Sequence, residues 1–169
     1  MISSKVTIND AEIKVEHEEC SDPSWCRDKD IFIESCSSDN NTLSTITFND
    51  YLTIYVFWES CPSGVSQEIL YVPETGMLFL GCGSISARVS TLESKLIDID
   101  NVFLFWGLSK HKEYVLETGE LECFLYSLSG EKVSSTAVDP PYEIEVTDSG
   151  IKFESIVLGS TWLRYENNG

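Results

Sequence analysis

The stretches YVPETGMLFL at residues 71–80 and YVLETGELEC at residues 114–123 share the pattern Tyr-Val-x-Glu-Thr-Gly-x-Leu and begin 43 residues apart. In both, a β-branched and aromatic segment precedes Glu-Thr-Gly, and apolar residues follow it. Glycine adopts the positive φ of a tight hairpin turn at little steric cost. Each stretch therefore predicts a β-hairpin that turns at Glu-Thr-Gly, with Glu74 and Glu117 as turn residues.

The rest of the chain carries the same two-residue period, with many β-branched and aromatic residues. It predicts about ten to twelve strands of ordinary length. The segment SARVSTLESKLIDI at 86–99 fits either a helix or two strands that turn near Glu-Ser-Lys, and its Ser, Thr and Val content favours the strands. We expect one all-β domain over residues 1–169, with antiparallel hairpins in a small propeller-like or sandwich arrangement and little or no helix.

The segment LYSLSGEKV at 125–133 resembles the closing hairpin of a quinoprotein-type β-propeller blade, where a strand ends in a short polar turn with glycine. The resemblance is local, and Val133-Ser134 stands where that family usually has a tryptophan. It implies four-stranded blades. A period of 43 residues is close to the length of one such blade, and 169 residues would hold about four.

The charge of the chain is strongly negative, with 28 Asp and Glu against 11 Lys and Arg, a net charge of −17. Such a surface repels phosphate backbones and anionic lipids, so we expect neither nucleic acid nor membrane as a partner. No apolar run reaches the length of about 18 residues that spans a bilayer. The polar start MISSKVTIND lacks the apolar core of a signal peptide, which favours a cytoplasmic location.

Six cysteines, at positions 20, 26, 36, 61, 82 and 123, are even in number and would allow disulfides. Apolar residues make up 42% of the chain, enough to form a core without cross-links. We therefore expect reduced thiols, with Cys82 and Cys123 as small core residues.

The segment CGSISAR places Cys82 five residues before Arg88 and resembles the signature loop of cysteine-dependent phosphatases. The resemblance implies a Cys82 thiolate that attacks phosphorus and an Arg88 guanidinium that binds the phosphate oxygens. The family usually has a histidine before the cysteine, where this chain has Gly81, and a small residue where it has Ile85. Phosphatase activity is therefore the alternative, and the first expectation is a protein without catalysis.

The residues His17, Cys20, Cys26 and Cys36 are of the types that bind zinc. Their spacing lacks the paired Cys-x2-4-Cys turns of zinc knuckles and ribbons. His17 also continues the apolar phase of Ile13 and Val15, which favours a half-buried histidine. We expect no metal and no cofactor.

The favoured interpretation is a protein-interaction domain whose acidic surface binds a basic protein. Trp58 and Trp106 lie in apolar strands and are expected in the core, whereas a loop with proline and serine carries Trp25 and predicts it to be exposed. In size and charge the chain is similar to bacterial immunity proteins, which mask basic toxin domains. In the competing interpretation, the negative charge only keeps the protein soluble through self-repulsion and binds no partner. The predicted contact residues are Trp25, Glu18, Glu19, Asp28 and Asp30.

Overall fold

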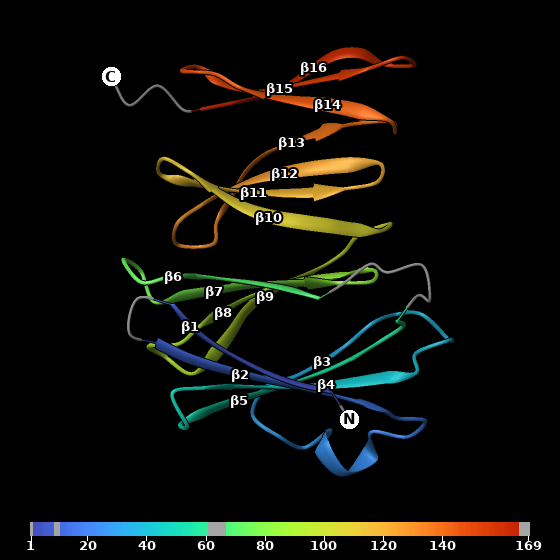
Figure 1. The fold of residues 1–169 in the computed structure, drawn as a ribbon, viewed down its shortest axis with the longest axis vertical. Coiled ribbons are helices and arrows are strands. Elements are labelled where there is room, and N and C mark those ends of the chain that lie inside the picture. The colour runs from blue at the N-terminus through green and yellow to red at the C-terminus, as the bar shows by residue number, and fades with distance from the viewer. Residues whose placement is uncertain (1, 9–10, 61–66, 166–169) are drawn as a thin grey trace.

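The computed structural model describes residues 2–8, 11–60 and 67–165, and these form four largely antiparallel sheets stacked face to face along the long axis of the molecule (Figure 1). The expected all-β fold of antiparallel hairpins is confirmed, as an open stack of sheets. Within the described residues the helical content is one 3-10 turn, η1 (Ser24–Cys26), and no helix is long and apolar enough to cross a membrane.

The first sheet has the strand order β1-β2-β4-β5-β3 and carries the one parallel pairing among the described strands, between β3 and β5. The loop between β2 and β3 contains η1 and covers part of the outer face of this sheet, where Cys26 packs on Leu43 and Phe57. The strands of the first sheet are β1 (Ile2–Ile8), β2 (Ala11–Glu19), β3 (Phe32–Glu34), β4 (Thr42–Phe48) and β5 (Leu52–Trp58).

The other three sheets are meanders in which each strand pairs with the next along the chain. The second sheet contains β6 (Glu68–Val72), β7 (Met77–Cys82), β8 (Ile85–Ser90) and β9 (Lys95–Asn101). The third contains β10 (Phe105–His111), β11 (Tyr114–Gly119), β12 (Glu122–Ser127) and β13 (Lys132–Ala137). The fourth contains β14 (Tyr142–Val146), β15 (Gly150–Ser155) and β16 (Gly159–Arg164).

The structural repeat is 37 residues long, and it is not the 43-residue offset of the two similar stretches. The first strands of these three sheets begin at Glu68, Phe105 and Tyr142, each 37 residues after the last. The third strands begin at Ile85, Glu122 and Gly159, with the same interval. The 43-residue match therefore aligns a first hairpin of one sheet with a second hairpin of the next.

The two Glu-Thr-Gly stretches accordingly have different structures. Residues 73–76 form the predicted turn between β6 and β7, and Gly76 has a φ of +66°. The second copy is not a turn: Glu117, Thr118 and Gly119 lie in β11, and Glu117 is 1% exposed. The prediction that Glu117 is a turn residue is wrong, because its place in the 37-residue repeat is that of strand residue Leu80.

Segment 86–99 forms β8, a turn and β9, as expected for the strand alternative. Trp58 is buried as predicted, but the prediction that Trp106 belongs to the core is wrong. The β10–β11 pairing shifts register between Phe105 and Gly107, so a bulge turns Trp106 outward, where it is 39% exposed and stacks on Tyr142 with ring centroids 5.2 Å apart.

Each pair of neighbouring sheets encloses a separate core. The first seam, between the first and second sheets, is filled by apolar side chains such as Ile46, Ile54, Leu78 and Leu80. The middle seam, between the second and third sheets, contains Val72, Phe79, Val115, Phe124 and Tyr126. The last seam, between the third and fourth sheets, contains Leu116, Cys123, Leu125, Ile151 and Phe153.

Candidate functional site

A tryptophan projects from the outer face of the first sheet, at one end of the stack. The buried Cys26 fixes η1 on this face, and the backbone N–H of Ser24 donates to Asp22 Oδ1 over 3.0 Å at the start of the turn. With Cys26 directed inward, its neighbour Trp25 is directed outward and is 57% exposed. Its ring meets the ring of Tyr55 edge to face, with centroids 5.6 Å apart.

Trp25 lines a shallow hollow of about 270 Å³ together with Glu16, His17, Glu18, Thr45 and Tyr55. We call Trp25, Tyr55, Glu16 and Glu18 the Trp25 surface. Strand β2 supplies the two carboxylates and β5 supplies the tyrosine. The result is an aromatic pair beside two carboxylates, of which Glu16 is 2.9 Å from Lys14 Nζ.

The exposure predicted for Trp25 is confirmed, and of the predicted contact residues the structure brings Trp25 and Glu18 together. Glu19 is exposed and lines a neighbouring hollow with Cys20 and Asn41. Asp28 and Asp30 are exposed on the loop after η1 and line neither hollow. Glu16 and Tyr55 were not among the predicted contact residues, although Glu16 lies two residues before Glu18 on the same strand face.

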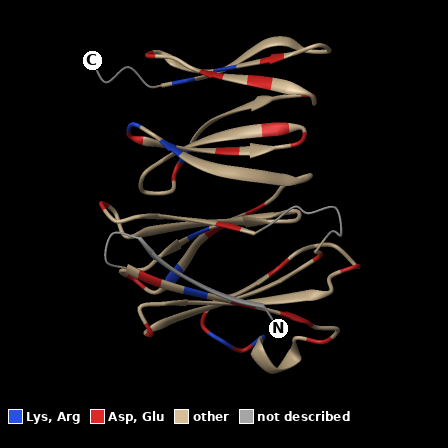
Figure 2. Ribbon diagram, viewed as in Figure 1, with Lys and Arg blue, Asp and Glu red and all other residues tan. Residues whose placement is uncertain are grey.

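Carboxylates occur on all four sheets, yet the charge is uneven along the stack (Figure 2). Residues 11–60 carry eleven Asp and Glu and three Lys and Arg. These 50 residues therefore hold a net −8 of the total −17, and they belong to the first sheet and its loops. The Trp25 surface lies at the most acidic end of the molecule.

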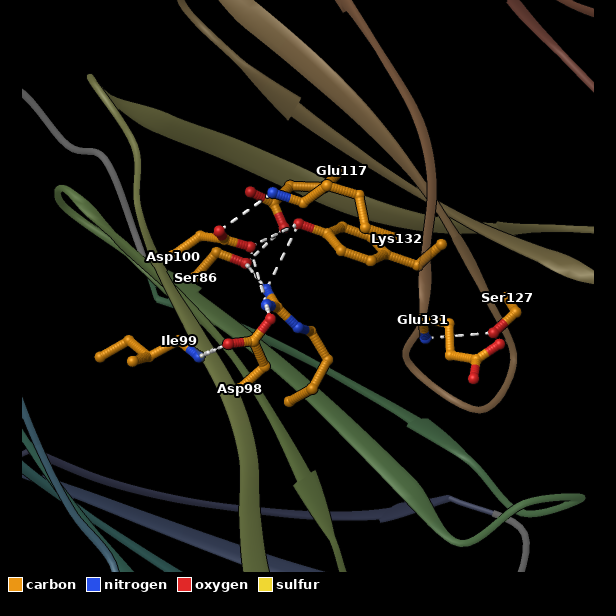
Figure 3. A network of polar contacts seen from close by, with 10 residues as sticks. Ser86, Asp98, Ile99, Asp100, Glu117, Ser127, Glu131 and Lys132 are labelled. Carbon is orange, nitrogen blue, oxygen red and sulfur yellow. Dashed lines mark hydrogen bonds and ion pairs between the residues drawn. The ribbon is translucent and has the colours of Figure 1, made fainter.

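A second group of polar residues lies in the middle seam, and we call it the ionic cluster: Ser86, Arg88, Asp98, Asp100, Glu117, Tyr126 and Lys132 (Figure 3). Ser86, Arg88, Glu117 and Tyr126 are buried, Asp100 is half-buried, and Asp98 and Lys132 are exposed. Arg88, on β8, is fully buried, and its Nη2 lies 2.7 Å from both Asp98 Oδ2 and Asp100 Oδ2 on β9. Its guanidinium also lies over the Tyr126 ring, 4.7 Å from the centroid. Arg88 thus joins the edge strand of the second sheet to the third sheet.

The third sheet contributes a carboxyl, a hydroxyl and an ammonium group to the cluster. Glu117 Oε2 accepts a hydrogen bond from the Ser86 hydroxyl, which itself accepts one from Arg88 Nη1 over 3.3 Å. The Tyr126 hydroxyl donates to Asp100 Oδ2 over 3.1 Å, and Lys132 Nζ lies 3.0 Å from Asp100 Oδ1.

The pKa values of two carboxyls in the cluster, Glu117 and Asp100, are shifted in opposite directions. Burial raises the pKa of Glu117 to about 7, although the hydrogen bond from Ser86 and the charge of Arg88 favour the ionised form. At Asp100, burial also opposes ionisation, but Lys132 and Arg88 outweigh it and hold the pKa below its usual range. Burial likewise raises the pKa of Tyr126, which stays a neutral donor.

The phosphatase alternative is not supported by the geometry of its two residues. Cys82 and Arg88 lie on the adjacent strands β7 and β8, but Cys82 packs in the first seam and Arg88 in the middle seam. They are on opposite faces of one sheet, so both cannot contact one phosphate. Burial also raises the pKa of the Cys82 thiol to about 12, which opposes formation of the thiolate nucleophile.

The four zinc-type residues are spread over the first sheet and its loops. His17 Nδ1 lies 2.8 Å from Ser44 Oγ, and burial lowers the pKa of this histidine. Cys26 is buried under η1, whereas Cys36 is exposed. Among the described residues no group of three or more His, Cys, Asp or Glu is arranged to hold a metal ion. The five described cysteines are free thiols, and Cys61 lies outside the described residues.

An apolar cleft of about 380 Å³ opens at the edge of the middle seam, between the loop before β10 and the β12–β13 hairpin. Phe103 and Leu121, which are 70% and 44% exposed, stand at this cleft, and Phe124 also lines it. Its polar lining residues, Asn101, Glu120 and Glu122, are not buried.

Comparison with known proteins assigns no relative to this chain: no protein-family model matches it, and no curated protein sequence matches it.

Proposed function

We propose that this protein is a non-catalytic interaction domain whose Trp25 surface binds a basic segment of another protein. The observation that carries the proposal is the exposed Trp25 ring, fixed beside Tyr55 and Glu18 at the most acidic end of the stack. Exposed tryptophan and tyrosine are the residue types that dominate binding energy at protein interfaces.

The chemistry of the Trp25 surface fits an arginine or lysine side chain. The face of an indole or phenol ring attracts a cation, and a nearby carboxylate supplies a charge-assisted partner for its N–H groups. The excess negative charge around it would steer a basic protein into contact and make association fast and dependent on salt. The same charge repels nucleic acid.

An immunity-type role, in which the domain masks a basic toxin domain, is one form of this proposal, supported by the size and net charge of the chain. A cytoplasmic location belongs to the same proposal. Free thiols are usual for proteins of a reducing compartment, and the five described cysteines are free.

Fluorescence anisotropy with a fluorescein-labelled nona-arginine peptide tests the Trp25 surface directly. We expect binding at low salt that weakens as salt is added, and we expect Trp25→Ala and Glu18→Gln each to weaken it by about fivefold to tenfold, the effect of removing one contact worth about 1 kcal/mol. The matched controls are Trp162→Ala and Glu143→Gln in the fourth sheet, which remove a tryptophan and a carboxylate far along the chain.

Glu143→Gln should change affinity by less than about twofold, the effect of one unit of net charge. Trp162→Ala leaves the net charge unchanged, so its affinity should equal that of the wild type. If Trp25→Ala has no more effect than Trp162→Ala, and Glu18→Gln no more than Glu143→Gln, only the overall charge attracts the peptide, and the Trp25 surface would then be abandoned. An absence of binding at low salt would reject the interaction proposal as a whole.

A further inference from the structure

Glu117 is buried in the middle seam without enough partners to remain ionised there. Its side chain is 1% exposed, Oε2 accepts from Ser86, and Oε1 has no hydrogen-bond partner among the described residues. The proposed function does not use this group. The apolar cleft nearby has no comparable buried polar side chain in its lining.

The charged groups around Glu117 are already committed to one another. From β8, Arg88 directs its Nη2 to Asp98 and Asp100 of β9, and its Nη1 reaches Ser86 and Tyr126. From β13, Lys132 pairs with Asp100. Within the described part of the chain, neither Arg88 nor Lys132 forms an ion pair with Glu117.

The remaining neighbours add no positive charge. Tyr126, on β12, is neutral, and the residue opposite Glu117 on β10 is the apolar Leu108. Leu108 N donates to Glu68 Oε2 of β6 over 2.8 Å, which brings a further carboxylate to this strand. With Glu117 ionised, three carboxylates of the cluster would face two cations. With Glu117 protonated, the charges of Asp98, Asp100, Arg88 and Lys132 balance.

We propose that the middle seam takes up one proton, on the Glu117 carboxyl, as the pH falls, and that this proton tightens the packing of the second sheet against the third. The proton comes from solvent and neutralises one carboxylate. A carboxyl that binds its proton more strongly in the folded state adds stability that is present at acidic pH. That stability is lost as the pH rises through the folded-state value, here from about pH 5 to about pH 8.

Chemical denaturation of the wild type and of Glu117→Gln at pH 5 and pH 9 tests the proposal. We expect the two proteins to be similarly stable at pH 5. Between pH 5 and pH 9 the unfolding constant of the wild type should rise on the order of a hundredfold relative to that of the variant. His17 and His111, whose pKa values burial lowers, act with the opposite sign, but both proteins contain them and the comparison cancels their effect.

Two further variants keep the test decisive. Glu117→Leu introduces the side chain that the equivalent position of the second sheet, Leu80, already has, and it replaces Glu117→Gln if that variant does not fold. Glu74→Gln is the control. Glu74 is the glutamate of the other Glu-Thr-Gly copy, and it is exposed and paired with Lys110. This variant should retain the pH dependence of the wild type. If wild type, Glu117→Gln and Glu117→Leu all share one pH dependence, no proton is linked to the seam and the proposal is overturned.

Discussion

The first hairpin of the second sheet and the strand β11 of the third sheet contain the same Glu-Thr-Gly tripeptide in different structural roles. Glu74 lies in an exposed turn and pairs with Lys110, which holds the pKa of its carboxyl below the usual range. Glu117 lies buried in β11, and its pKa is raised. In the second sheet, the position equivalent to Glu117 is Leu80. Leu80 pairs with Ala87 across the strands, and Glu117 pairs with Phe124, the residue equivalent to Ala87. The position in the sheet, and not the surrounding tripeptide, therefore determines whether the glutamate is buried and in which direction its pKa shifts.

The two seams differ accordingly. At the Leu80 position the first seam packs aliphatic side chains that need no partners. At the Glu117 position the middle seam holds a carboxyl, a fully buried arginine and a tyrosine hydroxyl, each of which needs hydrogen bonds to offset the loss of water. The middle seam is thus the one whose packing depends on protonation.

The largest expected effect comes from removing Arg88, the buried cation of the middle seam. Arg88→Met deprives the Asp100 carboxylate and Ser86 of a donor, and loss of one partner from a buried ionic group costs about 3 kcal/mol of unfolding free energy. Denaturant titration measures the loss. Arg164→Met, at an exposed position of the fourth sheet, should change stability by less than about 0.5 kcal/mol. A loss for Arg88→Met as small as that of the control would mean that the ionic cluster does not hold the seam.

The next largest losses of stability are expected from replacing the glycines of the two tripeptides, Gly119 and Gly76, and the physical reason differs between them. A Cβ at Gly119 would lie 2.8 Å from the Glu122 carbonyl oxygen and 3.1 Å from that of Leu104. Both are backbone atoms that cannot move aside, so Gly119→Ala should cost about 2 kcal/mol. Gly76→Ala should cost about 1 kcal/mol, since its φ of +66° strains any residue with a Cβ while the nearby Leu92 is exposed and can shift. Thermal or denaturant unfolding would give both values, and the reverse order would contradict this assignment of their roles.

Sequence reasoning recovered the fold class because strand alternation and turn glycines are local signals. Gly76 and Gly130 have positive φ at turns that the pattern identified. Glu117 was predicted in a turn because the same tripeptide forms a turn at 74–76 and strand at 117–119. The 37-residue repeat could not correct this, because neighbouring sheets have almost no identical residues at equivalent positions. The exposure of Trp25 could be predicted because its loop is recognisable from local sequence, whereas the binding role of Trp25 and Glu18 stays a prediction. Sequence reasoning could not find the ionic cluster, because Arg88, Glu117 and Lys132 come together only when two sheets stack.

The most direct test is to titrate the side-chain carboxyl carbons of glutamate by carbon-13 NMR, assigning Glu117 and Glu74 from the signals lost in Glu117→Gln and Glu74→Gln. The account predicts a Glu117 midpoint near pH 7. It also predicts that Glu74 titrates below the ordinary glutamate value of about 4.3, because Lys110 stabilises its ionised form. A Glu117 midpoint close to that of Glu74 would show that the middle seam tolerates the ionised carboxylate, and would contradict the account.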